Sequence, residues 1–431
     1  MFVLILWFIV ASSALAQNKE PNYTPFMFSL DTVEISGIVD SPDMETKTIL
    51  QLQQQLNDSL FQGVRYWNAA YPSYRWHQIM VTAGNRSEYR KNGGRMAILH
   101  LAVYDALAQV WKLKQDADTK APFQQNKKIK AVTEPSGAPA FICEWSTAAA
   151  ASHAVIGHYF PDQKAYLDSL LVNFKESRLR TGLQYEGDIE MGMAIGRGIA
   201  RQYIDYSKTD RTNAVWTGTV PTDKSLWTAT PSKWDPMKAQ WKPFTLAVAD
   251  QFRPGPPPSD WTAEMEELRQ FNTKHKSSDI AFKWKSEPVW DNLLALKILE
   301  YDLDPFQAAR ANALFHMARF DATIAAWDGK YHYWGIRPFQ YDPTFKPILI
   351  ETPNFPGYPA GHTTIAGALA MVLSKLFPHD AAQFEALAWE CSESRFEGGV
   401  HFRTDNEVGL IVGEKVGRHV WDAFQKCTSV K

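Results

Sequence analysis

The chain has little cysteine and no cysteine motif. Its 431 residues include three cysteines, Cys143, Cys391 and Cys427, whose spacing matches neither a CxxC pair nor a zinc-ligand pattern. The odd number excludes a scaffold that is built mainly on disulfide bonds. Cys391 and Cys427 could pair in an oxidising compartment, and a buried thiol at each position is the alternative.

An excess of charge and a second long apolar run are also missing. The formal net charge is -2, so the chain lacks the basic excess with which proteins bind nucleic acid or a membrane surface. The apolar run over residues 1–16 is too short to span a bilayer comfortably and ends in Ala14-Leu15-Ala16, a small-x-small cleavage pattern. We expect a signal peptide over 1–16 and a periplasmic or secreted protein without a membrane segment. One feature departs from the usual signal-peptide pattern, because no Lys or Arg precedes the run. An uncleaved anchor is the alternative.

Apolar residues make up 45% of the chain and charged residues 21%, which is a globular composition. Strand signals are few and short, whereas apolar residues recur at helical spacing in 93–113, 141–160 and 186–204. We therefore expect an all-α fold of helical bundles. Three histidines on these helices, His100, His153 and His158, are interpreted as packing residues.

The third of these segments contains Gly192, Gly196 and Gly198. No strand precedes them, so they do not match a dinucleotide-binding loop. They predict close packing between helices instead.

Composition divides the chain into two helical halves. A signal peptide (1–16) and a polar N-terminal arm (17–45) precede an N-terminal helical half (46–206); an irregular connection rich in Trp and Pro (207–260) then leads to a C-terminal helical half (261–431). In that second half we expect helices over 264–274, from about 291 to 326, over 380–393 and over 405–425. We find no strict internal repeat.

The stretch NFPGYPAGHTTIAGALAMVLSKLFP, residues 354–378, leads from prolines and glycines into an apolar helix. Pro356 and Pro359 favour an extended approach, and Gly361 lets the backbone come close to another group. Thr363 or Thr364 is expected to cap the helix. Because a helix N-terminus presents unpaired N–H groups and partial positive charge, this turn could hold an oxyanion, although a purely structural turn is the alternative.

Further polar residues stand beside aromatic residues in 327–339 and 394–405. Taken singly, Lys330 could be a solvated cation, Arg395 could pair with Glu393 or Glu397, and His401 with Asp405 could be a helix-surface pair.

Taken together, these residues suit a tetrahedral or trigonal-bipyramidal oxyanion. Lys330 supplies a point charge, and Arg337 and Arg395 each offer a planar fork that matches two oxygens. One histidine that is oriented by a carboxylate can bond the central atom, and the other, His362, can move a proton.

The order and spacing of these residues resemble a known signature. Lys330 to Arg337-Pro338 matches K-x6-RP, residues 359–362 match P-S-G-H with Ala360 in place of Ser, and Ser394-Arg395 with His401 and Asp405 matches S-R-x5-H-x3-D. This is the three-part motif of the type 2 phosphatidic acid phosphatase (PAP2) and vanadium-dependent haloperoxidase superfamily. Residues 95–106 and 320–327 also look like segments of the soluble, exported haloperoxidase branch.

The resemblance implies a role for each matching residue. His401 would be the vanadium ligand, and Asp405 would fix its orientation. Lys330, Arg337, Arg395 and the N–H of Gly361 would hold the equatorial oxygens of vanadate, and His362 would be the acid–base group. Other residues would support or flank the site: Ser394, Trp327 and Phe355.

Ala360 departs from the family pattern. The family serine donates a hydrogen bond to an oxyanion oxygen, and losing one bond to a charged group costs about 1.5–3 kcal/mol. We therefore expect a weaker anion site at this position.

The resemblance implies an enzyme that uses vanadate and hydrogen peroxide to oxidise a halide, bromide or iodide rather than chloride, with an organic acceptor as a further partner. The same cradle suits phosphate, so one alternative is a soluble acid phosphatase that acts through a phosphohistidine. A non-catalytic oxyanion-binding protein is a third. We expect no nucleic-acid partner, and a homodimer is a further expectation.

Overall fold

The computed structural model describes residues 23–31, 42–84, 94–115, 117–135, 139–349 and 351–428. Within these ranges the regular structure is helical, and the one β-bridge, between Leu226 and Gly335, is isolated. The prediction of an all-α fold is therefore confirmed. The predicted signal peptide and most of the predicted arm lie outside the described residues. None of the helices described here is long and apolar enough to cross a membrane.

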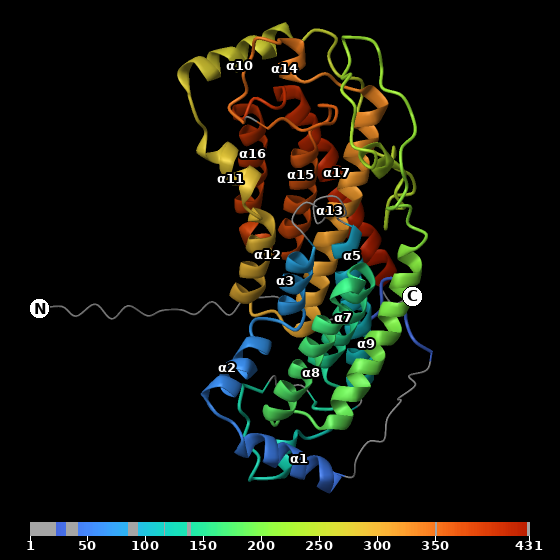
Figure 1. Ribbon diagram of the computed structural model, residues 1–431, viewed down its shortest axis with the longest axis vertical. Coiled ribbons are helices and arrows are strands. Elements are labelled where there is room, and N and C mark those ends of the chain that lie inside the picture. The colour runs from blue at the N-terminus through green and yellow to red at the C-terminus, as the bar shows by residue number, and fades with distance from the viewer. Residues whose placement is uncertain are drawn as a thin grey trace, which may run out of the picture.

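The N-terminal helices form the lower part of the molecule in Figure 1. They are α1 (Pro42–Gln54), α2 (Asp58–Trp67), α3 (Tyr74–Ala83), α5 (Gly94–Lys114), α6 (Pro122–Gln125), α7 (Glu144–Tyr159), the 3-10 turn η1 (Pro161–Gln163), α8 (Lys164–Arg180) and α9 (Glu186–Ser207). Helix α1 begins at Pro42, so the last residues of the predicted arm are helical.

Gly192 and Gly196 let α7 and α9 approach closely, as predicted, whereas Gly198 lies against Leu30, which is not in a helix. A Cβ atom on Gly192 would lie 2.3 Å from the Oγ atom of Ser146, and one on Gly196 would lie 2.3 Å from the carbonyl oxygen of Thr147. Both distances are far below van der Waals contact, so any larger residue would push the two helices apart.

An irregular segment follows α9 and contains one short 3-10 helix, η2 (Asp235–Gln240). Figure 1 shows it as a green-to-yellow loop beside the upper part of the long helix α13. The prediction of an irregular connection at this place in the chain is confirmed.

The C-terminal helices are α10 (Thr262–Lys274), α11 (Asp279–Ser286), α12 (Val289–Glu300), α13 (Pro305–Tyr333), α14 (Pro338–Tyr341), α15 (Gly361–Leu376), the 3-10 turn η3 (Pro378–Asp380), α16 (Ala381–Glu397) and α17 (Arg403–Thr428). The expectation of one helix from about 291 to 326 is wrong. Asp304 accepts a hydrogen bond from the Gln307 N–H, and Pro305 starts a new helix, because proline suits the first helical position.

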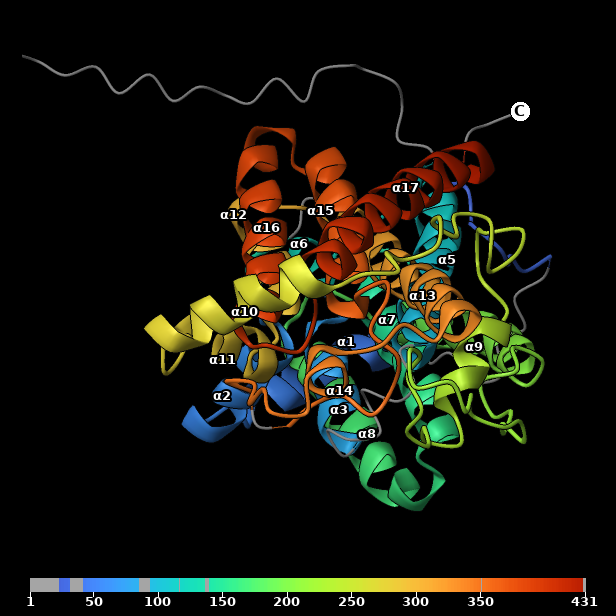
Figure 2. The same ribbon diagram turned by 90° about the horizontal axis from the view of Figure 1, so that it is seen from above.

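Helix α13 joins the two halves. It packs against α5 of the N-terminal half and against α15 and α17 of the C-terminal half, and all four lie close together when seen from above (Figure 2). Buried residues of both halves, such as Leu101, Leu314 and Leu369, belong to one hydrophobic cluster. The two halves therefore share a single core, and α13 runs through it.

Two buried aspartates attach irregular segments to this core. Asp321 of α13 accepts hydrogen bonds from the backbone N–H groups of Phe244, Thr245 and Leu246 and from the Thr245 hydroxyl. Asp105 of α5 accepts bonds from the N–H groups of residues 26–28 in the same manner.

The segments around these two aspartates are similar in sequence. Residues 100–111 read HLAVYDALAQVW and residues 316–327 read HMARFDATIAAW, with His, Asp and Trp in matching positions. This short similarity is looser than a strict repeat. The two aspartates nevertheless have the same role, since each binds the backbone of an irregular segment in its own half.

Replacing Asp321 with asparagine is expected to lower the free energy of unfolding by about 2–4 kcal/mol, because an amide cannot accept all of these bonds and buried donors would lose their partner. Chemical denaturation would measure the effect. Asp205→Asn is the matched control, since Asp205 forms an exposed pair with Lys208 and its loss should change stability by less than about 0.5 kcal/mol. Equal losses in both variants would contradict the anchoring role.

Candidate oxyanion site

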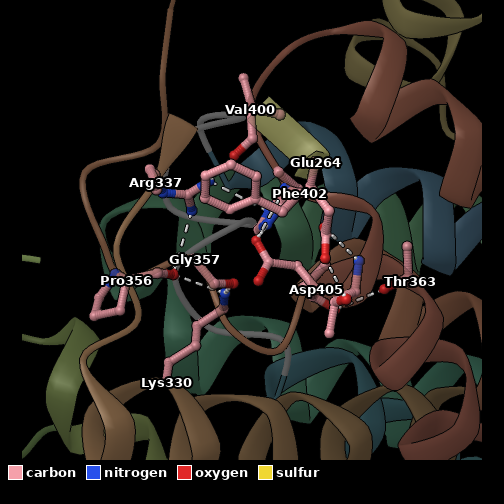
Figure 3. A network of polar contacts seen from close by, with 12 residues as sticks. Glu264, Lys330, Arg337, Pro356, Gly357, Thr363, Val400, Phe402 and Asp405 are labelled. Carbon is pink, nitrogen blue, oxygen red and sulfur yellow. Dashed lines mark hydrogen bonds and ion pairs between the residues drawn. The ribbon is translucent and has the colours of Figure 1, made fainter. Parts of the chain in front are cut away.

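The predicted site residues come from separate elements that meet near the top of the molecule in Figure 1. Lys330 lies in the last turn of α13, Arg337 just before α14, Gly361 at the start of α15 and Arg395 in the last turn of α16. His401 precedes α17. Figure 3 shows Lys330 and Arg337 pointing toward the same loop, residues 355–357, with Asp405 close by.

Lys330 is completely buried, so its interpretation as a solvated cation is wrong. Its Nζ atom donates hydrogen bonds to the carbonyl oxygens of Pro356 at 2.8 Å and Gly357 at 2.7 Å. Burial, and next the charge of Arg337, lower the pKa of the Lys330 ammonium well below its ordinary value. An anion beside it would therefore stabilise its charged form.

Arg337 is also completely buried. Its Nε atom donates to the Phe355 carbonyl at 2.7 Å, and its Nη1 atom donates to the Val400 carbonyl at 2.5 Å. Burial lowers the pKa of the guanidinium to about 10. These backbone contacts hold the guanidinium plane in one orientation, and a carbonyl dipole compensates a full charge only in part.

His401 and Asp405 form a buried pair, so their interpretation as a helix-surface pair is wrong. The Nδ1 atom of His401 lies 3.0 Å from Oδ2 of Asp405, which also accepts a bond from the Phe402 N–H. The Nε2 atom lies 3.3 Å from Nη1 of Arg337. When Asp405 is ionised, Nδ1 carries the proton, and the lone pair of Nε2 faces the cations.

Burial raises the pKa of Asp405 to about 7, although Lys330 and Arg337 oppose the shift. Burial, and then the charges of Arg337 and Lys330, lower the pKa of His401 well below its ordinary value. The site thus keeps His401 neutral and able to act as a ligand or a nucleophile. The site brings three cations together around the one buried carboxylate of Asp405, which favours binding of an anion.

Arg395 makes contacts other than the predicted ones. Its Nε atom donates to the Ser394 hydroxyl and its Nη2 atom to the Ala281 carbonyl, both at 3.0 Å. The alternative reading, in which Arg395 pairs with Glu393 or Glu397, does not hold, because Glu393 binds Arg403 and Glu397 accepts a bond from Ser278. Arg395 is 3% exposed, and its charge contributes to the lowered pKa of His401.

The start of α15 lies against the cluster. Gly361 is the first helical residue, and a Cβ atom on it would lie 3.0 Å from the Trp327 ring and 3.5 Å from Cε of Lys330. Glycine at this position therefore lets the helix N-terminus approach Lys330 closely. His362 follows it, is exposed, and acts electrostatically on His401.

The predicted threonine cap is wrong. Ala360 holds the N-cap position, and the hydroxyls of Thr363 and Thr364 both donate back to its carbonyl oxygen at 2.9 Å. A threonine inside the first turn reaches the carbonyl three or four residues earlier more readily than the N–H groups ahead of it. The Ala360 N–H donates to the Asp405 carbonyl, which ties α15 to the start of α17.

Aromatic side chains surround the cations. The rings of Trp327 and Phe355 lie 5.2 Å apart, and the Nζ atom of Lys330 is 5.3 Å from the centre of the Phe355 ring. Arg337 lies 5.1 Å from the same ring.

Lys238, from η2, was missed by the sequence analysis. Its Nζ atom lies 4.1 Å from the centre of the Trp327 ring and 2.7 Å from Asp235. No motif or periodicity marks it, because it comes from the irregular segment. Its position depends on how that segment folds over α13.

The three cysteines are free. Cys143 and Cys391 are buried, in agreement with one of the two predicted alternatives, whereas Cys427 is exposed and does not fit it. Cys391 lies close to the site, with its Sγ atom 3.9 Å from the His362 carbonyl, and burial raises the pKa of its thiol to about 12. It is therefore a poor nucleophile.

A known protein family matches the part of the chain that contains these residues. Residues 311–429, which include most of α13 and all of α14 to α17, match the PAP2 superfamily. The chain carries a PAP2-superfamily domain. The superfamily predicted from the motif is thus confirmed, and the PAP2 domain includes Lys330, Arg337, Arg395 and His401.

Two curated relatives of this chain are non-specific acid phosphatases. The one from Salmonella typhi is 32% identical over 120 residues, and the one from Salmonella typhimurium is 35% identical over 118 residues. These matches cover 27% and 26% of this chain. They cover 48% and 46% of the relatives, so the chain spans about half the length of the phosphatases that it matches.

Solved structures resemble a much larger part of the chain. A bacterial vanadium-dependent iodoperoxidase superposes with a TM-score of 0.61 and 21% identity over 88% of this chain and 95% of its own. A bacterial vanadium-dependent chloroperoxidase in its apo form superposes with a TM-score of 0.60 and 16% sequence identity. That match covers 78% of this chain and 93% of the chloroperoxidase chain. The PAP2 domain and the helices before it therefore share the fold of vanadium-dependent haloperoxidases.

Proposed function

We propose that this protein is a vanadate-dependent haloperoxidase-like enzyme that oxidises bromide or iodide with hydrogen peroxide. One observation carries the proposal: the structural likeness to the iodoperoxidase includes the N-terminal half, which lies outside the PAP2 match. The cluster of buried cations around one neutral histidine gives that fold a site with suitable charge.

The residues present fit vanadate. The Nε2 atom of His401 offers a lone pair among the cations, and Asp405 holds the ring in that tautomer. Lys330, Arg337 and Arg395 supply positive charge, and the N–H of Gly361 lies at the N-terminus of α15. When bound, vanadate supplies a Lewis acid that activates hydrogen peroxide for attack by a halide.

The remaining chemistry belongs to this chain. His362 is exposed, so it can exchange protons between the site and solvent. Trp327 and Phe355 form an apolar wall that keeps water from the cations and strengthens their interaction with an anion. The ammonium of Lys330 keeps one donor beyond its two carbonyl contacts.

A second candidate is an acid phosphatase, which the identity to the two Salmonella enzymes favours. In that reaction Nε2 of His401 would attack phosphorus, and His362 would protonate the leaving alkoxide. The cations would stabilise the charge that develops on the equatorial oxygens.

One panel separates these functions. Protein stripped of bound anions is assayed, with and without orthovanadate, for peroxide-dependent bromide or iodide oxidation and for p-nitrophenyl phosphate hydrolysis. Halide oxidation that requires vanadate supports the proposal. Ester hydrolysis that vanadate inhibits supports the phosphatase. Anion binding without either turnover would leave an oxyanion-binding protein and contradict both.

Anion binding is expected to take up protons. An anion beside Lys330 would raise its lowered pKa, so the anion affinity should fall as the pH rises past that pKa. Calorimetric titration in buffers with different ionisation enthalpies would measure this proton uptake. Sulfate is a suitable anion because its own charge is constant near neutral pH. Lys330→Met should reduce it. The same heat in every buffer would show that Lys330 is already charged.

Residues 1–16 lead to a separate prediction about export. If they are a signal peptide, the protein secreted by a bacterial host should begin at Gln17. N-terminal sequencing of protein from the periplasm or medium would show this. Recovery of full-length chain from the membrane fraction would favour the uncleaved anchor.

A further inference from the structure

Three histidines meet in the core, away from the oxyanion site. They are His77 of α3, His100 of α5 and His316 of α13, each of which offers a ring nitrogen within 4.8 Å of the others. These helices lie near mid-height in Figure 1. His316 precedes Lys330 by 14 residues on α13, which corresponds to about 21 Å along the helix.

The three imidazoles form only some of the hydrogen bonds that their ring nitrogens could make. The Nδ1 atom of His77 lies 3.0 Å from Nε2 of His100, and the rings of His100 and His316 stack with their centres 4.5 Å apart. Nδ1 of His100 and both nitrogens of His316 have no hydrogen-bond partner among the described residues. His100 is buried in the core, as interpreted from the sequence, but only one of its two ring nitrogens has a partner. His153 is half-buried and pairs with Asp168, whereas His158 is exposed, so the interpretation of His158 as a packing residue is wrong.

Such a cluster is unfavourable without a ligand. His100 is 0% and His316 1% exposed, and each buried polar atom without a partner costs stability. We propose that His77, His100 and His316 bind one divalent late first-row transition ion, of which Zn²⁺ is the type. Imidazole nitrogens suit Zn²⁺, Co²⁺, Ni²⁺ and Cu²⁺, whereas Mg²⁺ and Ca²⁺ prefer oxygen ligands.

The protonation state suits a metal. Burial lowers the pKa of His77, and it lowers the pKa of His100 and His316 well below the ordinary value, so all three rings are neutral at neutral pH. A neutral imidazole presents the lone pair that a metal requires.

The charges around the cluster nearly balance. Arg319 of α13 binds Asp291 of α12 through two bonds of 2.8 Å, and both groups act electrostatically on His77 and His100. Asp291 offsets the charge of Arg319 and opposes the lowering of the pKa of His77 and His100, which means that it favours positive charge at the cluster.

The geometry requires a modest adjustment. Zinc–nitrogen bonds of about 2.0–2.1 Å place tetrahedral ligand atoms roughly 3.3 Å apart, so nitrogens up to 4.8 Å apart must move inward by about 1 Å or more. Rotation of the rings about χ2 can supply this movement and would open the stack of His100 on His316. His77 is half-buried, whereas His100 and His316 are completely buried, so His77 is the ligand closest to solvent.

The site would be structural. His100 and His316 are the matching first residues of the two similar segments 100–111 and 316–327, one from each half. An ion held by both, and by α3, would link the N-terminal half to α13. This inference does not depend on the proposed haloperoxidase activity.

The test uses the full chain after removal of metal by a chelator. Co²⁺ binding is monitored by the visible d–d absorption of the ion, and Zn²⁺ binding is measured by calorimetry. Each titration should show one ion bound per chain. Bound Zn²⁺ should also raise the midpoint temperature of thermal unfolding. His77→Gln, His100→Gln and His316→Gln should each weaken binding by at least about tenfold, since even indirect partners of a ligand contribute that much. His153→Gln is the matched control and should bind normally.

Three results would overturn the proposal. These are the absence of saturable Zn²⁺ and Co²⁺ binding, unchanged affinity in the His77 variant, and X-ray absorption of the zinc-loaded protein that shows fewer than three nitrogen ligands. The absorption measurement uses the unmodified chain, so it decides the matter even if the variants of the two buried histidines fail to fold.

Discussion

Replacing His401 with alanine is expected to abolish both vanadate-dependent halide oxidation and phosphate-ester hydrolysis. The loss should exceed the roughly 10²–10³-fold in turnover that follows removal of one oxyanion-hole hydrogen-bond donor, because His401 supplies the ring nitrogen that would bond the central atom. Steady-state assays in both reactions, with circular dichroism to confirm folding, would measure the effect.

His379→Ala is the matched control. His379 is an exposed histidine in η3, beyond the far end of α15, and its loss should leave both activities unchanged. Retained activity in His401→Ala would show that another group bonds the central atom. Equal losses in the two variants would point to general destabilisation.

Replacing Ala360 with serine is expected to raise oxyanion affinity by about ten- to a hundredfold. A hydrogen bond to a charged group is worth about 1.5–3 kcal/mol, and residue 360 stands at the N-cap of α15, directly before Gly361. Calorimetric titration with orthovanadate would measure the change.

Ala360→Gly provides the comparison, since glycine is tolerated at an N-cap and carries no hydroxyl. If Ser and Gly change the affinity alike, the effect comes from the backbone. If serine leaves the affinity at the level of alanine, its hydroxyl is used as a helix cap and does not reach the anion.

Motif spacing was enough to predict the residues that meet at the site. Lys330, Arg337, His401 and Asp405 lie far apart in sequence, and periodicity alone gives no reason to place them together. Their order matched a known signature, which carries information about tertiary contacts that a single sequence does not express. The helices were predicted well where apolar periodicity was long, as over 93–113 and 186–204.

Local chemistry explains the errors. The break between α12 and α13 was signalled by Asp304 followed by Pro305, a cap and a first-turn proline, but the apolar pattern on both sides obscured it. The partners of Arg395 depend on the packing of α11 against α16, which no local pattern reveals. The same applies to Lys238.

The similarity between residues 100–111 and 316–327 was visible in the sequence but too short to count as a repeat. In the structure, Asp105 and Asp321 bind irregular segments in the same manner, and His100 stacks on His316. Equivalent positions in the two halves thus meet in the shared core.

Helix α13 spans 29 residues and bears Asp321 and, two and a half turns later, Lys330. One residue inserted between them would rotate everything downstream by about 100° and advance it by roughly 1.5 Å. The ammonium would then swing away from the 355–357 loop while residues 244–246 kept their anchor. The number of residues between Asp321 and Lys330 is therefore as critical as the two side chains themselves. We expect insertions to be tolerated in the connecting loops and not within this part of α13.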